Sequence, residues 1–192
     1  MKSITVDEAR GFPFHYPSNA AVVTSRDGDD RNCIAVSRHA WFAFKPPMYG
    51  VGVGSKKHTC GLIERSGEFV INWLPFDRVT TIAACGSKSG RDGDKFTEFG
   101  IETFDPLVVG APVLEGVYAA YECQVDSEHR VGDSTWFAGH IVAVHFDEDV
   151  FDETLQMKKL NPILWLSRET YVKAENPRVY RVDRRVLTVE EM

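Results

Sequence analysis

Apolar and polar residues alternate along much of the second half of this chain, with the period of two that is typical of a β-strand. In residues 117–126 the apolar side consists of Val117, Ala119, Tyr121, Cys123 and Val125, and the polar side of Tyr118, Glu122, Gln124 and Asp126. Residues 130–133 predict a turn, and residues 135–146 are nearly all apolar. The two segments therefore predict a long β-hairpin.

The first half of the chain predicts further strands. Residues 20–25 and 32–37 are apolar and flank a charged segment at 26–31, which predicts strand, turn and strand. Pro46 and Pro47 exclude a helix and precede a predicted strand at 48–54, in which every second residue from Gly50 is a glycine. These glycines would leave one face bare, open to a ligand or another backbone. Residues 68–74 predict another strand, and strand-like pieces lie within 161–183, including 179–182.

Few and short helices are predicted between the strands. Residues 59–65 predict a helix that ends at Gly67, and Asp77 is the predicted N-cap of a second helix that ends near Gly86. Residues 88–94 are polar and glycine-rich, which predicts a loop, and residues 94–99 predict one or two helical turns. A last short helix is predicted at 152–160.

Strands with few helices between them favour an antiparallel barrel over alternating βαβ units. No repeat or linker divides residues 1–192, so we expect a single domain. The glycines at 50, 52 and 54 are not a dinucleotide-binding fingerprint, because their spacing is wrong and they lie within a strand instead of in the turn that follows it.

Composition narrows the choice of partners. The chain has 192 residues, of which 43% are hydrophobic and 26% are charged, and its formal net charge is −6. This balance disfavours nucleic acid and anionic membranes, since both attract basic proteins. No apolar stretch approaches the roughly 20 residues of a transmembrane helix, and no apolar core of a secretory signal is visible. We therefore expect a cytoplasmic protein.

The cysteines and histidines do not predict a metal site. The four cysteines, which are Cys33, Cys60, Cys85 and Cys123, are far apart and form no CxxC pair. We expect them to be small buried side chains in a reducing compartment. His140 and His145 are expected on opposite faces of one strand, because an odd separation reverses the side-chain direction.

The segment Gly54-Ser-Lys-Lys-His-Thr59 is the strongest candidate for binding chemistry. It joins a predicted strand to a predicted helix, whose N-terminus offers free N–H groups and the positive end of the helix dipole. The hydroxyl groups of Ser55 and Thr59 and the charge of a lysine would complete a phosphate site. The alternative is a solvated basic turn in which Thr59 is an ordinary N-cap.

Other polar segments are less specific. Residues 32–39 end a predicted strand with Asn32, Ser37, Arg38 and His39, which would either hydrogen-bond a heteroaromatic ring or lie in solvent. Asp94-Lys95-Phe96 is typical of a helix start. The four tryptophans are expected in the core or in an interface. No acid–base or nucleophilic constellation is visible, so no catalytic residue is predicted.

The order of these segments resembles the flavin reductase-like family, the FMN-binding split barrels that include flavoredoxins. The matching segments are Tyr16-Pro17, Val22-Val-Thr24, residues 32–37, Pro46-Pro47, residues 55–59, residues 67–72, Asp94-Lys-Phe96, Gly132-Asp133 and Gly139-His-Ile-Val142. The resemblance covers about residues 12–150 and leaves 151–192 as a C-terminal extension, expected to pack on the barrel or on a dimer partner. It implies a six-stranded antiparallel split β-barrel with Greek-key character and a few short peripheral helices, which forms a homodimer.

The resemblance also implies an FMN site at or near the dimer interface. The residues that would hold the FMN phosphate are Ser55, Lys56, Lys57, His58 and Thr59. Those that would lie along the isoalloxazine ring and the ribityl chain are Asn32, Val36, Ser37, Arg38 and His39, while Lys95 would approach the polar edge of the flavin. Many relatives have a histidine directly after the Gly-Asp pair, where this chain has Ser134. In relatives that use NAD(P)H, that histidine is thought to lie near the flavin face.

Two functions follow from the resemblance. The first is an FMN-binding oxidoreductase that works as an NAD(P)H-dependent flavin reductase, with a monooxygenase as a candidate acceptor. The second is a flavoredoxin-like electron-transfer protein that receives electrons from a redox protein and has little NAD(P)H activity, which Ser134 favours. A split-barrel module without flavin is a third reading, disfavoured by the intact segment 55–59. One basic turn can hold one terminal phosphate, so we expect FMN over FAD. No metal is expected, because the cysteines and histidines predict no metal site.

Overall fold

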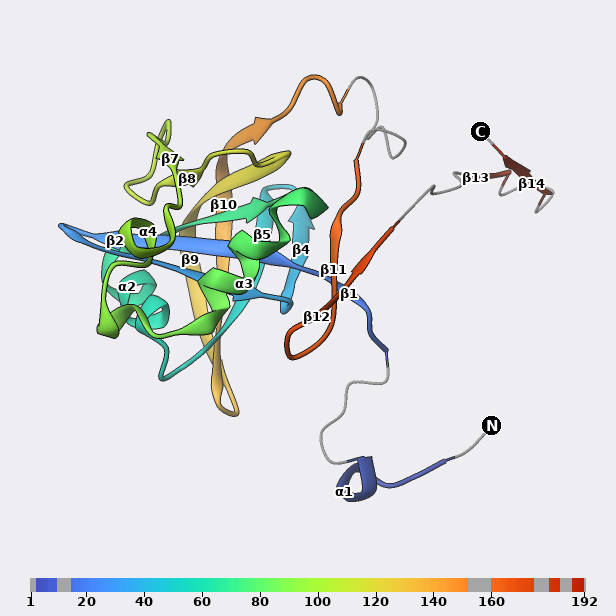
Figure 1. Cartoon of the computed structure of the whole chain (residues 1–192), viewed down its shortest axis with the longest axis horizontal. Helices are drawn as coiled ribbons and strands as arrows, with labels where there is room; N and C mark the ends of the chain where they lie inside the picture. Colours follow the sequence, from blue (N-terminus) through green and yellow to red (C-terminus); the bar gives the residue numbers. More distant parts are fainter. Residues whose placement is uncertain (1–2, 10–14, 152–159, 175–179, 184–187, 192) are drawn as a thin grey trace.

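An antiparallel sheet dominates the computed structural model, which describes residues 3–9, 15–151, 160–174, 180–183 and 188–191 (Figure 1). In this part of the chain, the sheet has seven strands in the order β3-β2-β6-β9-β10-β5-β4. Their bounds are Ala21–Asp27 (β2), Asp30–Val36 (β3), His39–Phe44 (β4), Pro47–Gly54 (β5), Glu68–Trp73 (β6), Ala119–Val131 (β9) and Ser134–Phe146 (β10).

Short strands and helices surround this sheet. The strands pair as β1 (Ser18–Asn19) with β11 (Ile163–Ser167) and β12 (Thr170–Lys173), β7 (Thr103–Phe104) with β8 (Val113–Leu114), and β13 (Tyr180–Asp183) with β14 (Thr188–Glu191). The helices are α1 (Val6–Ala9), α2 (His58–Ser66), α3 (Val79–Ser87) and α4 (Lys95–Phe99), with 3-10 turns η1 (Phe76–Arg78) and η2 (Gly90–Asp92).

The mostly-β, antiparallel prediction is confirmed, but the prediction of six strands is wrong. The additional strand is β4, which pairs with β5 at one end of the sheet. β3 forms the opposite end, and the two end strands are not hydrogen-bonded to each other, so the expected barrel is not closed. Sequence patterning missed β4 because three of its side chains, Trp41, Phe42 and Phe44, are large, apolar and exposed instead of alternating with polar residues.

The predicted hairpins are present, with shorter turns than expected. β2 and β3 pair from Ala21 opposite Val36 to Asp27 opposite Asp30, so most of the charged segment 26–31 belongs to the strands. β9 and β10 form the second hairpin, with Gly132 at its turn in a left-handed conformation. The predicted helix at 152–160 falls almost entirely outside the described residues, and β13 begins at Tyr180, within the strand expected at 179–182.

Helix ends follow local rules in two of three cases. Gly67 ends α2 with φ 69°, and its N–H donates to the carbonyl oxygen of Ile63. Asp94 caps α4 by accepting from the N–H of Phe96. Asp77, the predicted N-cap of α3, lies instead within η1, because a 3-10 turn follows Pro75 and α3 begins only at Val79.

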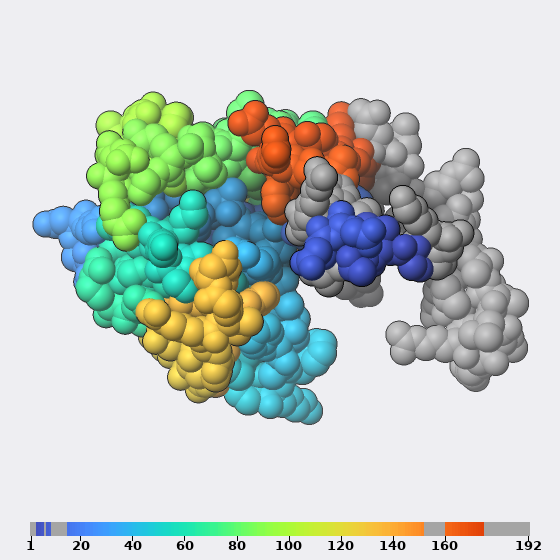
Figure 2. All heavy atoms as spheres, turned by 90° about the horizontal axis from the view of Figure 1, so that it is seen from below, coloured from blue at the N-terminus to red at the C-terminus, as the bar shows by residue number. Residues whose placement is uncertain are grey.

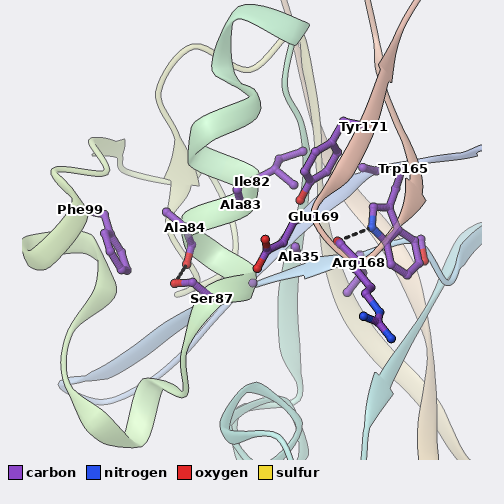
Figure 3. Close-up of a pocket in the computed structure, with 14 residues that line it drawn as sticks. Ala35, Ile82, Ala83, Ala84, Ser87, Phe99, Trp165, Arg168, Glu169 and Tyr171 are labelled. Atoms are coloured by element: carbon purple, nitrogen blue, oxygen red, sulfur yellow. Dashed lines mark hydrogen bonds between the residues drawn. The ribbon is translucent and has the colours of Figure 1, made fainter.

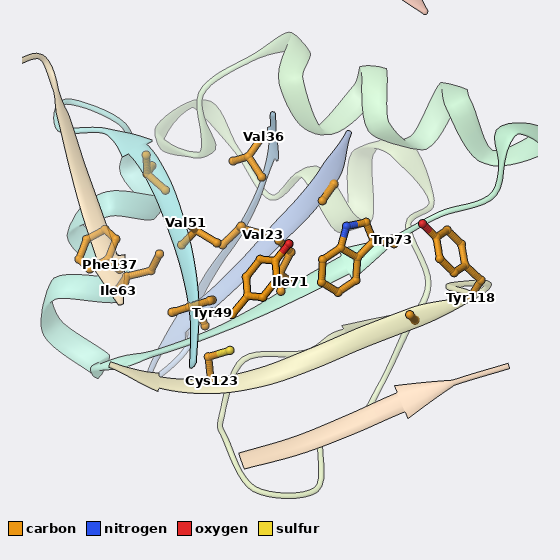
Figure 4. Close-up of a cluster of buried hydrophobic side chains, with 14 of the residues drawn as sticks. Val23, Val36, Tyr49, Val51, Ile63, Ile71, Trp73, Tyr118, Cys123 and Phe137 are labelled. Atoms are coloured by element: carbon orange, nitrogen blue, oxygen red, sulfur yellow. The ribbon is translucent and has the colours of Figure 1, made fainter. Parts of the chain in front are cut away.

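The core lies on both faces of β2. Val23 packs in one cluster with Val51, Ile71 and Phe137, and Ile63 of α2 belongs to the same cluster (Figure 4). Val22, the residue before it on β2, belongs to a second cluster that joins the sheet to α3 and α4. Residues 20–25 form a continuous apolar run, and not an alternating one, because both faces of the strand are covered.

The glycine face of β5 is covered by aromatic rings. A Cβ on Gly50 would lie 2.1 Å from an atom of the Phe42 ring, and one on Gly52 would lie 2.9 Å from Trp136. The glycine face was predicted to be open to a ligand or another backbone. At these two glycines it is instead occupied by side chains of β4 and β10. Gly54, at the end of β5, lies instead against the side chain of Lys57.

Register shifts change the predicted faces of the long hairpin. His140 pairs with Gln124 and His145 with Ala120, and these partners are four residues apart on β9. His140 and His145 therefore share a face, because the shift between Ile141 and Ala143 interrupts the alternation on which the opposite prediction relied. The four cysteines are free and buried, as predicted. Among the described residues, no helix combines the length and the apolar character needed to cross a bilayer.

Candidate functional site

A cavity of about 290 Å³ lies where the ends of β3 and β5 meet the end of α3. We call it the β3–β5 groove. Its lining residues are Tyr16, Ile34, Ala35, Val36, Ser37, Arg38, Gly52, Val53, Gly54, Lys57, Gly86 and Trp165. Four of the predicted binding residues, namely Val36, Ser37, Arg38 and Lys57, therefore come together on one surface.

Backbone hydrogen bonds fix the shape of the groove. The N–H of Gly52 donates to the carbonyl oxygen of Arg38 (2.7 Å), which holds the connection after β3 against β5. At the other end, the N–H of Lys57 donates to the carbonyl oxygen of Gly54 (2.8 Å), and the N–H of Ser55 donates to that of Asp133 (2.9 Å). The turn after β5 is thus anchored to the β9–β10 hairpin.

The start of α2 supplies the positive charge of the groove. Lys57, not Thr59, is the N-cap residue, and no side chain of the described residues caps this helix end. Uncapped N–H groups at a helix start, with the positive end of its dipole, attract anions. Lys56 is exposed and does not line the groove, while its carbonyl oxygen accepts from Arg91 Nη1 (2.9 Å). Arg38 lines the groove on the opposite strand end.

Asn32 and Thr59 form a buried polar pair next to this helix. Asn32 Nδ2 donates to Thr59 Oγ1 (2.8 Å), and both residues are buried. Asn32 Oδ1 is buried without a hydrogen-bond partner among the described residues. A Cβ on Gly90 would lie 2.3 Å from this oxygen, so the loop after α3 reaches Asn32 only because residue 90 is a glycine.

Two other residues of the predicted phosphate turn have partners elsewhere. Ser55 Oγ lies 3.0 Å from Thr135 Oγ1 on β10. His58 Nε2 lies 2.9 Å from Asp30 Oδ1, at the start of β3. Neither residue lines the groove.

Lys95 is buried behind the groove. Its Nζ donates to the carbonyl oxygens of Cys33 (2.8 Å) and Cys85 (2.7 Å) and so ties β3 to α3. Burial lowers the pKa of the Lys95 ammonium. The structure therefore places this lysine as a bridge between two backbone segments that line the groove.

His39 lies in an aromatic cluster outside the groove. Its Nδ1 is 2.8 Å from the Tyr49 hydroxyl and its Nε2 is 3.1 Å from the carbonyl oxygen of Asn19. The His39 ring also contacts the edge of the Trp73 ring, 5.9 Å between centroids. Burial lowers the pKa of His39, which favours a neutral ring.

Eight of the twelve groove residues were not among the predicted binding residues. Five of them lie on β3 and β5, and the other three are Tyr16, Gly86 and Trp165. The Tyr16 hydroxyl lies 3.4 Å from Ser37 Oγ, and the Tyr16 and Trp165 rings are 5.2 Å apart between centroids. Tyr16 was part of a matching segment but carried no binding role there. Trp165 lies in the segment 151–192 that was expected to be an extension. It reaches the groove because β11 pairs with β1, the short strand directly before β2.

A larger cavity of about 650 Å³ adjoins the groove (Figure 3). It lies between α3 and the hairpin of β11 and β12, which we call the 163–173 hairpin. In Figure 2 the orange surface of this hairpin lies directly against the green surface that follows β6. Five residues line both cavities: Ala35, Val36, Ser37, Gly86 and Trp165.

Comparisons with known proteins identify the family of this chain. Residues 14–173 match the family described as flavin reductase like domain. The chain is 28% identical over 119 residues to a flavin reductase of Pseudomonas putida (62% of this chain and 66% of that protein), and 33% identical over 122 residues to the flavin-dependent monooxygenase reductase subunit HsaB of Rhodococcus jostii (63% and 58%). The matched family segment extends beyond residue 150 and includes the 163–173 hairpin.

Solved structures show the same fold. The crystal structure of an FMN-binding protein from Thermus thermophilus with bound p-hydroxybenzaldehyde is 29% identical, with a TM-score of 0.77, and the match covers 90% of this chain and 93% of that one. Flavoredoxin from Methanosarcina acetivorans is 23% identical, with a TM-score of 0.81, over 92% and 94% of the two chains, which supports the fold.

Proposed function

We propose that this chain, which belongs to the flavin reductase-like family, is an FMN-binding oxidoreductase that works as a flavin reductase and holds FMN in the β3–β5 groove. The observation that carries the assignment of the groove is that Arg38 and Lys57, which is the N-cap residue of the uncapped helix α2, line one cavity. An NADH-dependent FMN reductase of Streptomyces nodosus, 25% identical over 135 residues, supports the choice of reaction.

The groove fits FMN on three grounds. One cation, Lys57, at the start of a helix suits the single phosphate of FMN. The apolar wall of Ile34, Ala35 and Val36 suits an aromatic ring system. Beside the groove, though not among its lining residues, Asn32 Oδ1 is a buried acceptor without a partner in the described residues, and a ribityl hydroxyl would be a suitable donor for it.

Each residue then has a role in holding the cofactor. Lys57, with the N–H groups at the start of α2, would bind the phosphate, and Ser37 and Arg38 would hydrogen-bond the polar edge of the ring. Thr59 orients Asn32, and Lys95 fixes the distance between β3 and α3. FMN supplies the redox chemistry when bound, so the chain itself needs no acid–base constellation.

Ser134 favours a second function, that of a flavoredoxin-like electron carrier. Ser134 pairs with Gly54, directly beside the groove, and its Oγ donates to Asp133 Oδ1 (3.0 Å). The residue at this position is thus a buried hydroxyl turned to its neighbour, where the resemblance leads us to expect an imidazole. Mixing the FMN-loaded protein with NADH or NADPH in a stopped-flow spectrometer separates the two functions: bleaching of the flavin supports the reductase, and no bleaching supports the carrier.

We propose in addition that two copies of the chain associate through β4. β4 is an end strand of the sheet, and Trp41, Phe42 and Phe44 on it are 39%, 48% and 80% exposed. An unpaired strand edge with exposed aromatic side chains favours association. Light scattering should show a dimer, and Phe44→Lys should shift the protein to monomer, whereas a monomeric wild-type protein contradicts this interface.

The phosphate assignment is tested with the neighbouring lysines. Lys57→Ala removes a cation from the groove and should weaken FMN binding by about 10-fold or more, the effect of losing one charge-assisted hydrogen bond of about 1.5–3 kcal/mol. Lys56→Ala is the matched control, since this side chain does not line the groove, and its FMN affinity should stay near that of the wild type.

Riboflavin and FAD complete the experiment. Riboflavin lacks the phosphate, so its affinity should be the same for the wild type and for Lys57→Ala. FMN should bind more tightly than FAD, because Lys57 alone among the residues that line the groove lies at a helix start, and the second phosphate of FAD would find no such site there. Equal effects of the two lysine substitutions on FMN, or no effect of either, would refute the assignment of the phosphate to Lys57.

A further inference from the structure

The larger cavity shares five lining residues with the groove, and its remaining walls are of two kinds. On α3 it is lined by residues with small side chains or none, including Ala83, Ala84 and Gly86. On the 163–173 hairpin it is lined by the rings of Trp165 and Tyr171. A wall of small residues that faces a wall of aromatic rings leaves a space suited to a flat molecule.

The aromatic wall is held in place from within the hairpin. The indole N–H of Trp165 donates to the carbonyl oxygen of Arg168 (2.8 Å), across the tip of the hairpin (Figure 3). Arg168 adopts φ 43°, a left-handed conformation that is uncommon for a residue with a side chain. Trp165 and Tyr171 also pair directly across β11 and β12, so both rings belong to one rigid unit.

The charges of the cavity favour an ion of neither sign. Among the described residues that line it, one is cationic, Arg168, and one is anionic, Glu169. A neutral ligand therefore suits this lining at least as well as a charged one. NAD(P)H, with its two or three phosphate groups, would find a single cation there.

Hydrogen-bond donors face this space. Ser37, Arg168 and Tyr171 carry donors, and Ser37 belongs to both cavities. Burial raises the pKa of the Tyr171 hydroxyl, so that it remains a donor at neutral pH. Carbonyl oxygens are the complementary acceptors.

From this geometry we propose that the cavity between α3 and the 163–173 hairpin binds the electron acceptor, and that this acceptor is a neutral, flat carbonyl compound of the quinone class. The proposal rests on the proposed function, which supplies the electrons. A quinone takes up two electrons and two protons to become a hydroquinone, and reduced FMN carries both. The five shared lining residues place the acceptor next to the cofactor groove.

The test fills the cavity without touching the groove. Ala84→Leu adds three carbon atoms to the cavity wall and keeps good helix propensity. Thr80→Leu is the matched control, because Thr80 is an exposed residue of the same helix that does not line the cavity. Menadione, a neutral bicyclic quinone, is the probe, and its binding to the flavin-free protein is measured by titration calorimetry.

We expect Ala84→Leu to weaken menadione binding by about 10-fold or more, and Thr80→Leu to leave it unchanged. FMN affinity should remain the same in both variants. In the FMN-loaded protein reduced with dithionite, reoxidation by menadione should slow in Ala84→Leu, whereas reoxidation by ferricyanide, an outer-sphere acceptor, should not.

The outcomes separate the two proposals. Menadione binding that is absent in the wild type, or equally affected by both substitutions, overturns the cavity assignment even if FMN binds. Absence of FMN binding, with menadione binding that Ala84→Leu weakens, overturns the proposed function and supports the ligand class of the cavity. Equal slowing of ferricyanide and menadione also overturns the cavity assignment, because it would place the defect at the flavin.

Discussion

Glu122 is a buried carboxylate on which a whole loop depends. It is 0% exposed, and it accepts hydrogen bonds from the backbone N–H groups of Leu107 (2.6 Å), Val108 (2.7 Å) and Val109 (2.9 Å). His145 Nε2 lies 2.7 Å from Glu122 Oε1, the oxygen that also accepts from Leu107. The carboxylate thus holds the connection between β7 and β8 against the outer face of the long hairpin.

Glu122→Gln is the change that isolates the charge. Glutamine has the same shape, but it offers one oxygen and an NH₂ group that would face the N–H donors. We expect a loss of about 3–5 kcal/mol in the free energy of unfolding, from two or more charge-assisted hydrogen bonds at about 1.5–3 kcal/mol each. Glu68→Gln is the matched control, since Glu68 accepts one hydrogen bond, from Gly110, and should lose about 1 kcal/mol.

The pH dependence gives a second readout. Burial alone would raise the pKa of Glu122, but the N–H groups of Leu107 and Val109, with His145 and Val108, hold it below the ordinary value. A carboxyl whose pKa is lowered by folding stabilises the protein above its unfolded pKa of about 4.3, and this contribution disappears as the pH falls through the folded pKa. The difference in the free energy of unfolding between wild type and Glu122→Gln should therefore be largest at neutral pH and should decrease in acid.

Urea unfolding at several pH values measures both quantities. A loss no larger than that of Glu68→Gln would refute the argument from hydrogen-bond number. A difference between wild type and Glu122→Gln that stays constant from neutral to acid pH would refute the role of the charge.

Two further substitutions test contacts behind the groove. Lys95→Met keeps the length of the side chain but leaves the carbonyl oxygens of Cys33 and Cys85 without their donor, and urea unfolding should show a loss of about 2–4 kcal/mol; a loss below about 1 kcal/mol would contradict the bridge. Gly90→Ala places a Cβ 2.3 Å from Asn32 Oδ1, so Asn32 must move, and FMN titration should show affinity weakened by about 3-fold or more; unchanged affinity would separate Asn32 from the cofactor.

Local patterns predicted the elements that obey local rules. The β2–β3 hairpin, α2 with its left-handed Gly67, and α4 with Asp94 as its cap all depend on residues within a few positions of one another. β4 was missed because its pairing with β5 follows a tight connection through Pro46, and because its exposed aromatic residues resemble a loop or an interface. The expected barrel was wrong for a related reason: strand number and closure are set by long-range pairing.

The same distinction explains the site. The sequence located the polar segments that meet at the groove, but it did not reveal the direction of each side chain. In the turn at 55–59, only Lys57 lines the cavity, because each of three others has a partner far along the chain: Thr135 for Ser55, Asp30 for His58 and Asn32 for Thr59. Those partners are known only once the fold is known.

The different roles of the residues in the turn at 55–59 have a physical consequence. Three polar side chains of the turn, those of Ser55, His58 and Thr59, interact with other parts of the protein. These contacts fix the start of α2 and leave its N–H groups uncapped. The ordering entropy of the proposed anion site is thus already lost when the chain folds, before any ligand arrives. A single lysine with a preorganised helix start can then bind a phosphate that several flexible lysines on a solvated turn would hold only weakly. The value of the turn at 55–59 lies less in the number of its cations than in the contacts that hold it still.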